Sequence, residues 1–101
     1  MSIQTCPTTM VEAPADRVWR LLTIPAEFQR WTGLRMTKGP GRPLAAGDRV
    51  EFFAGLLRLH LIRLERPRRL ELEMQFPFGI VNHEVIVITP QSDRTCRVTY
   101  N

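Results

Sequence analysis

Four polar side chains lie among apolar residues in segments where polar and apolar positions alternate: Arg58, His60, His83 and Tyr100. A histidine titrates near neutral pH and is suited to moving protons, and all four side chains could orient a substrate. The alternation places no carboxylate on the same face of the sheet as the histidines, so it does not predict the acid–base couple of a typical active site. A lone histidine on an apolar strand is also a common structural residue, and a tyrosine there is a common amphipathic wall residue. Catalytic, ligand-binding and structural roles therefore stay open for these residues.

Other kinds of site have little support in the sequence. Two histidines and the distant thiols of Cys6 and Cys96 do not have the spacing of a metal site, so we expect no metal and no cofactor. We expect both cysteines to be small buried thiols in a reducing compartment. The glycines near residue 40 are not followed by the Lys-Ser/Thr pair of a phosphate-binding loop.

The composition is that of one folded domain, residues 1–101. Hydrophobic residues make up 44% and charged residues 24%, which is ordinary for a globular protein. No apolar run approaches the roughly 18 residues of a membrane-spanning helix, and the N-terminus lacks a signal-peptide pattern, so we expect a cytoplasmic protein without a membrane span. The net charge is +4, but the arginines are scattered and no aromatic residues interleave with them. We therefore expect no nucleic-acid partner.

The candidate residues must be positioned by strands, because the hydrophobic pattern changes from a helical period to a period of two near residue 34. Before that point, residues 15–22 have an apolar helical face, Pro25 ends this helix and begins a second one, and Gly33 closes the second. Strands are expected over residues 3–11, 34–38, 49–54, 56–65, 69–76, 80–89 and 94–100. Short turns between successive strands predict antiparallel neighbours. The sequence thus predicts an α+β fold with a curved antiparallel sheet of about seven strands and two short helices after the first strand.

Alternation within the strands predicts which side chains face inward. The glutamates of residues 69–76 belong to the solvent side, which sends Leu72 and Met74 inward. A turn centred on Pro67 would then pair Ile62 with Leu72. By the same rule in the other strands, together with one helical tryptophan, the side chains expected to line the inner face and contact a ligand are Trp31, Arg58, His60, Ile62, Leu72, Met74, Phe76, His83, Val85, Val98 and Tyr100.

Two features of this assignment depend on register. The rule assigns Asn82 and Glu84 to the solvent side of their strand and His83 to the inner side. In the strand that pairs through the Pro67 turn, a register error of one residue would put Arg58 and His60 in water.

Several short segments, taken together and in order, resemble the SRPBCC superfamily, which includes the START domains, the birch-pollen-allergen-like proteins and the polyketide cyclase/dehydrase-like proteins. The segments that carry the resemblance are residues 13–19 (APADRVW), 25–33 (PAEFQRWTG), 47–50 (GDRV), 65–70 (ERPRRL), 83–84 (HE) and 95–99 (TCRVT). The resemblance implies a helix-grip fold, in which a long C-terminal helix lies in a concave sheet. This sequence stops directly after an expected strand, so we expect that helix to be absent and the domain to be incomplete at its C-terminus.

Three functions stay open, and the sequence does not decide whether the protein is an enzyme. An apolar inner face with few polar points is typical of a site for a small hydrophobic or aromatic metabolite. The resemblance implies, as an alternative, a polyketide cyclase/dehydratase-like enzyme in which Arg58, His60, His83 and Tyr100 orient the substrate and move protons. A third possibility is an interaction module whose uncovered sheet is completed by a partner chain, for example in a homodimer.

Overall fold

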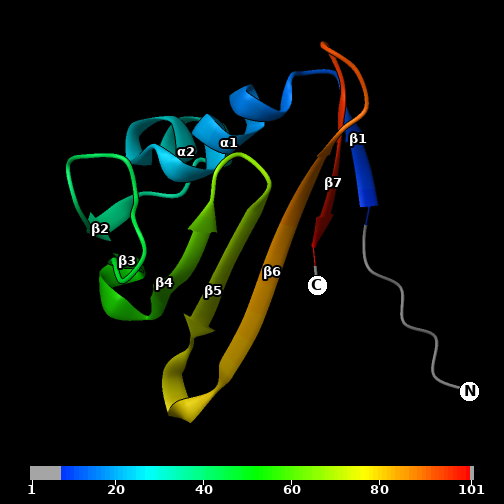
Figure 1. The fold of residues 1–101 in the computed structure, drawn as a ribbon. Coiled ribbons are helices and arrows are strands. Elements are labelled where there is room, and N and C mark those ends of the chain that lie inside the picture. The colour runs from blue at the N-terminus through cyan, green and yellow to red at the C-terminus, as the bar shows by residue number, and fades with distance from the viewer. Residues whose placement is uncertain (1–7, 101) are drawn as a thin grey trace, which may run out of the picture.

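The computed structural model describes residues 8–100, which form two helices and seven strands (Figure 1). In chain order the elements are β1 (Thr8–Val11), α1 (Ala15–Thr23), α2 (Pro25–Thr32), β2 (Met36–Lys38), β3 (Arg49–Phe52), the 3-10 turn η1 (Phe53–Gly55), β4 (Leu57–Glu65), β5 (Arg69–Gln75), the 3-10 turn η2 (Pro77–Gly79), β6 (Val81–Pro90) and β7 (Cys96–Tyr100). The predicted α+β order is confirmed. Residues 3–7 of the first expected strand, and with them Cys6, lie outside the described residues.

The strands form one antiparallel sheet in the order β1-β7-β6-β5-β4-β3-β2. Strands β2 to β7 are a meander, and β1 closes the other edge by pairing with β7. The sheet is curved, as predicted. Both helices lie across one end of it, whereas η1 and η2 lie at the opposite end (Figure 1). The sheet therefore has a covered end and an open end.

Local sequence signals account for the helices. Pro14 is extended, with φ −64° and ψ 151°, and α1 starts directly after it with Asp16 in its first turn, where a carboxylate favours the helix dipole. Helix α2 starts at Pro25, whose missing N–H costs nothing at a first helical position. Gly33 ends α2 in the left-handed conformation, with φ 74°, which a glycine adopts without strain.

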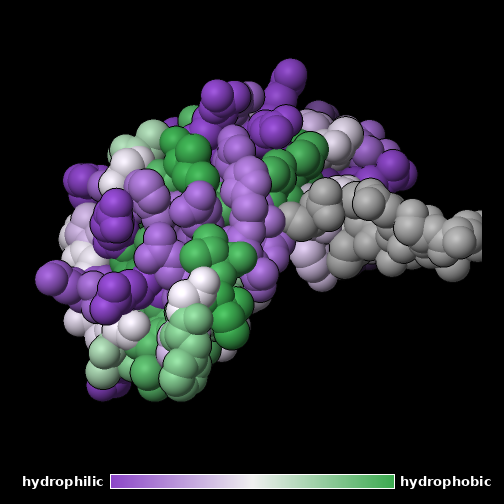
Figure 2. All heavy atoms as spheres, turned by 90° about the horizontal axis from the view of Figure 1, so that it is seen from below, coloured by the Kyte–Doolittle hydropathy of each residue, from purple (hydrophilic) through white to green (hydrophobic). Residues whose placement is uncertain are grey.

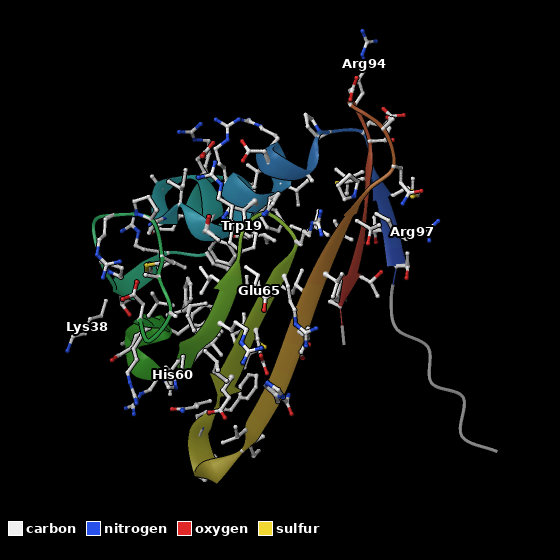
Figure 3. All side chains as sticks on the ribbon, viewed as in Figure 1. Trp19, Lys38, His60, Glu65, Arg94 and Arg97 are labelled. Carbon is white, nitrogen blue, oxygen red and sulfur yellow. The ribbon has the colours of Figure 1, made fainter. Side chains whose placement is uncertain are left out.

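The core lies between α1 and the sheet. Trp19 of α1 is 5% exposed, and Figure 3 shows its side chain between the helix and the strands. It belongs to the same buried cluster as Leu61, Leu70 and Ile88 from three adjacent strands. Full burial of such side chains contributes roughly 1.5–3 kcal/mol each, so this cluster fixes the helices on the sheet.

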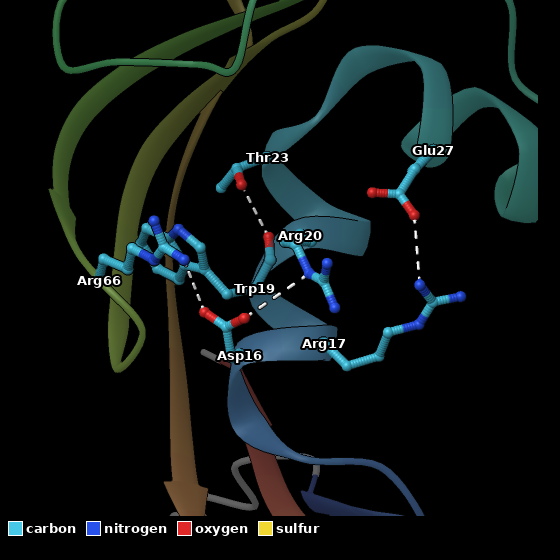
Figure 4. A network of polar contacts seen from close by, with 7 residues as sticks. All are labelled: Asp16, Arg17, Trp19, Arg20, Thr23, Glu27 and Arg66. Carbon is cyan, nitrogen blue, oxygen red and sulfur yellow. Dashed lines mark hydrogen bonds and ion pairs between the residues drawn. The ribbon is translucent and has the colours of Figure 1, made fainter.

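Polar contacts at the surface join α1 to its neighbours (Figure 4). Arg66, in the turn between β4 and β5, donates a hydrogen bond of 2.8 Å from Nη2 to Oδ1 of Asp16, and this bond lowers the pKa of the Asp16 carboxyl. Arg17 of α1 approaches Glu27 of α2 at 3.5 Å. These pairs are exposed to solvent, so they orient the helix more than they stabilise it.

The register between β4 and β5 corrects one prediction. Leu64 lies opposite Leu70, but Leu61 rather than the predicted Ile62 lies opposite Leu72. Ile62 is an extra residue on β4, a β-bulge, and it is 38% exposed. A bulge changes which residues share a face, and an unbroken alternation could not predict it.

The bulge reverses the face assignment for the part of β4 that precedes it. His60 lies opposite Glu73, and Arg58 lies opposite Gln75, on the solvent side of the sheet. The prediction that Arg58, His60 and Ile62 share the inner face is therefore wrong. Because opposed residues of an antiparallel pair point to the same side, Leu57, Leu59 and Leu61 take the inner positions instead.

Strand β6 also shows the reverse of the predicted assignment. Glu84 lies opposite Leu72, and His83 lies opposite Glu73. Residues 85–88 are apolar at both parities, so alternation does not distinguish the two faces there, and the packing of Ile88 into the core decides. The predicted side is wrong for Asn82, His83, Glu84 and Val85.

Candidate ligand-binding face

The inner face is the side of the sheet that carries the core and faces the helices. Its members follow from the strand register, because directly opposed residues point to the same side. They are Thr9, Val11, Met36, Val50, Phe52, Leu57, Leu59, Leu61, Leu64, Leu70, Leu72, Met74, Asn82, Glu84, Ile86, Ile88, Pro90, Cys96, Val98 and Tyr100. The face is apolar except for a few positions, most of them near the open end.

The covered end of the inner face encloses a cavity of about 50 Å³. Its walls come from both helical and strand residues, including Leu22, Phe28, Leu44, Phe52 and Leu72. Pockets that hold small molecules usually have volumes of roughly 300–1,000 Å³, so this cavity is too small for a metabolite.

The open end carries three polar side chains among apolar neighbours. Glu84 is partly buried and lies opposite Leu72 of β5. Asn82 is the next inner residue of β6 toward the open end. Tyr100 of β7 lies opposite Ile86 of β6. Glu84 is the one charged side chain on the inner face within the strands that the structure describes. Sequence alternation placed Asn82 and Glu84 outside, and no local signal marks them as inner residues.

The structure separates the predicted ligand-lining residues into two groups. Leu72, Met74, Val98 and Tyr100 share the inner face. Arg58, His60, His83 and Val85 lie on the outer face, and Ile62 is at the bulge. The four polar side chains singled out in the sequence thus do not converge, because Tyr100 lies on the opposite side of the sheet from the other three.

Trp31 lies apart from the inner face. It is 55% exposed, and its indole Nε1 donates a hydrogen bond of 2.7 Å to the carbonyl oxygen of Leu21. Its ring packs edge to face against that of Phe28, with 5.8 Å between the ring centroids. Phe28 lines the enclosed cavity and Trp31 does not. The geometry gives Trp31 the role of joining α2 to α1.

Polar and charged side chains form a row across the outer face. Arg49, His60, Glu73 and His83 are successive partners across four strands. His83 Nε2 lies 2.9 Å from Oε1 of Glu71, on the neighbouring strand. Figure 3 shows His60 near the open end of the sheet. Such solvated pairs are typical of a polar surface and contribute little to stability.

A hollow of about 380 Å³ lies on the outer side at the open end. It is bordered by Arg58, Gln75 and Val81 of the strands and by Leu56 and Phe76 next to them. Phe76, predicted to face inward, thus borders this hollow.

Apolar side chains are exposed around the loops of the open end. Phe78 is 99% exposed, Leu56 61% and Ile80 55%. Figure 2 views the molecule from this end and shows hydrophobic surface among hydrophilic side chains. Two of the exposed aromatics, Phe53 and Phe78, have left-handed backbone, with φ 54° and 68°. Such backbone is strained in residues other than glycine.

Metal and thiol chemistry have no geometric basis in residues 8–100. Histidine, cysteine, aspartate and glutamate side chains nowhere gather in threes there as a metal site requires. Cys96 is completely buried, and burial raises the pKa of its thiol, which makes it unreactive. Neither helix of this part of the chain is long and apolar enough to cross a membrane.

Solved structures of other proteins have a similar fold. CalU16 from Micromonospora echinospora matches with a TM-score of 0.76 and 24% identity, over 92% of this chain and 55% of that one. PFC0360w, an HSP90 activator from Plasmodium falciparum, matches with a TM-score of 0.73 and 12% identity, over 94% of this chain and 69% of that one. DynU16, from the dynemicin biosynthetic locus, matches with a TM-score of 0.69 and 21% identity, over 94% of this chain and 35% of that one. The sequence matches no protein-family model, and no curated protein is similar enough to match it.

These likenesses place the chain in the helix-grip class of folds, with a seven-stranded curved sheet and two helices. The chain spans about half the length of CalU16 and about a third of that of DynU16.

Proposed function

We propose that the protein belongs to the SRPBCC superfamily and binds a small, largely apolar molecule on the open end of its inner face. The observation that carries this proposal is the composition of that surface. Met74 and Ile86 provide apolar contact, and Glu84 and Tyr100 are polar points that can orient a ligand. A mostly apolar site with a few convergent polar groups is the usual composition of a small-molecule pocket.

Binding is favoured over catalysis by the positions of the titratable groups. His60 and His83 lie on the outer face, so they cannot act on a molecule held by Met74 and Ile86 on the inner face. The proposal of a cyclase-like enzyme would have to rest on Glu84 and Tyr100 instead. The similarity to CalU16 and DynU16 is a similarity of fold and assigns neither a ligand nor a reaction.

A direct test uses an uncharged naphthalene probe, N-acetyl dansylcadaverine, whose fluorescence rises in an apolar site. Met74→Lys places a charge on the inner face, whereas Gln75→Lys places the same charge on the next residue, on the outer face. We expect the first change to weaken probe binding at least tenfold and the second to leave it within twofold. Equal effects of the two variants, or no saturable binding to the unmodified protein, would contradict the proposal.

A second candidate function is docking of a partner chain on the open end. The observation that favours it is the exposed apolar side chains of Leu56, Phe78 and Ile80. The HSP90 activator among the proteins of similar fold is compatible with such a role. Light scattering over a range of concentrations tests the homodimer, and a strictly monomeric protein at high concentration would exclude it.

A further inference from the structure

We infer that Glu84 selects ligands that carry a cationic or strongly hydrogen-bond-donating group, such as a primary ammonium attached to an apolar body. This inference rests on the proposed function, because it concerns the specificity of the same inner face. It begins from the location of one carboxylate.

Glu84 lies on an otherwise uncharged surface. Across the sheet its direct partner is Leu72, which is 7% exposed and belongs to the core, and the next inner residues on either side are Asn82 and Ile86. The remaining acidic residues of β3 and β5, Glu51, Glu71 and Glu73, lie on the outer face. Glu84 therefore differs from its neighbours in the face that it occupies.

The Glu84 carboxylate also lacks a protein partner in the described part of the chain. The structure gives it no hydrogen bond and no ion pair, whereas Glu71 is paired with His83 at 2.9 Å. A partly buried carboxylate loses hydration when an apolar molecule covers it, and this loss is unfavourable unless a donor replaces the water. A ligand that covers Glu84 without supplying a donor would therefore bind weakly.

Neighbouring groups strengthen the selection. Tyr100, opposite Ile86, is a diagonal neighbour of Glu84, so its hydroxyl is within reach of the same ligand group. Asn82 offers an amide oxygen and an amide N–H on the same strand. No basic side chain lies on the inner strand positions of residues 8–100, although the net charge of the chain is +4. The face therefore favours ammonium groups and disfavours carboxylates.

Three probes with one naphthalene body test this selection: dansylcadaverine, which carries an ammonium, its uncharged N-acetyl derivative, and N-dansyl-6-aminohexanoic acid, which carries a carboxylate. We expect the ammonium probe to bind roughly tenfold or more tightly than the uncharged probe, because hydrogen bonds to charged groups are the strong ones. The carboxylate probe should bind more weakly than both.

The variant Glu84→Gln should remove the advantage of the ammonium probe and leave the binding of the uncharged probe within twofold. Glu73→Gln is the matched control, because it removes the same charge from the outer face of the adjacent strand. An ammonium preference that survives Glu84→Gln, or that falls equally in Glu73→Gln, would overturn the inference. Saturable binding of the uncharged probe that depends on Met74, without ammonium preference, would overturn the role of Glu84 alone. Absence of such binding would overturn the proposed function as well.

Discussion

Leu61 of β4 lies directly opposite Leu72 of β5, and Ile62, the next residue along β4, is left without a partner on β5. Leu61 is 1% exposed and Ile62 is 38% exposed. Two adjacent aliphatic residues thus have different environments. The bulge at Ile62 is the reason that the leucines of β4, rather than its arginine and histidine, form the inner face.

Truncation of these two residues should have unequal effects on the free energy of unfolding. Leu61→Ala leaves a cavity in the core and should lower it by about 2–5 kcal/mol. Ile62→Ala removes a partly exposed side chain and should lower it by less than about 1 kcal/mol. Urea unfolding followed by circular dichroism measures both changes. Equal losses would show that the bulge is placed wrongly.

Replacement of the histidines should leave ligand binding intact. His60→Gln and His83→Gln alter the outer face, so the dissociation constant of the uncharged naphthalene probe should stay within twofold of that of the unmodified protein. Tyr100→Leu, on the inner face, should change the affinity of the ammonium probe more than that of the uncharged probe. A loss of binding in either histidine variant with an unchanged circular dichroism spectrum would contradict the face assignment.

The pairing of Asp48 predicts a pH-dependent contribution to stability. Asp48 accepts hydrogen bonds of 2.8 and 2.9 Å from Arg42 and one of 2.7 Å from the backbone N–H of Ala45. The hydrogen bond from Arg42, followed by that from Ala45, lowers the pKa of Asp48 below its ordinary value of 3.8. Because the folded-state pKa is the lower one, the contribution is present above the ordinary value and is lost as the pH falls through the folded-state value.

Asp48→Asn should therefore lower the free energy of unfolding by roughly 1–2 kcal/mol at pH 7, and the difference should shrink as the pH falls below about 4. Urea unfolding of both proteins at several pH values measures it. Asp93→Asn, in the exposed turn between β6 and β7, is the control and should show little difference at any pH. A deficit for Asp48→Asn that persists at the lowest pH would contradict the assignment to this ion pair.

The backbone of Phe78 predicts a substitution that does not destabilise. Its φ is 68° and its side chain is 99% exposed, so Phe78→Gly relieves a left-handed conformation and loses almost no packing. The strain relieved, about 1–2 kcal/mol, should match or exceed the roughly 0.5–1 kcal/mol of added chain entropy in the unfolded state. Urea unfolding should show an unchanged or slightly raised free energy. A loss above about 1 kcal/mol would mean that Phe78 packs against another part of the protein.

The elements of the fold could be predicted because each has a local signal. Pro25 begins α2, Gly33 ends it, and the turns between strands contain proline or glycine, except the turn between β6 and β7, which contains Ser92 and Asp93. The alternation over β5 also identified Leu72 and Met74 as inner residues, and the same rule placed Val98 and Tyr100 on that side. These assignments depend only on period and on turn chemistry.

The assignment of faces in β4 and β6 could not be predicted in this way. In β4 the unpaired Ile62 shifts the alternation, and no turn residue marks the bulge. In β6 apolar residues occupy both parities, so the burial of Ile88 in the core, a tertiary effect, places Glu84 inside. Because of these two errors, the sequence assigned His60 and His83 to the inner face, whereas the structure places Glu84 there.

We expect a ligand to bind the inner face of the sheet and not the outer face, and methionine methyl NMR distinguishes the two faces. Met74 lies on the inner face of β5, whereas Met10 of β1 lies opposite Arg97 on the outer face and is 54% exposed. With methyl-labelled methionine and Met→Leu variants for assignment, titration with the uncharged naphthalene probe should shift the Met74 signal and leave Met10 unchanged. A shift of Met10 without Met74, or saturation of the probe with neither signal moving, would contradict binding on the inner face.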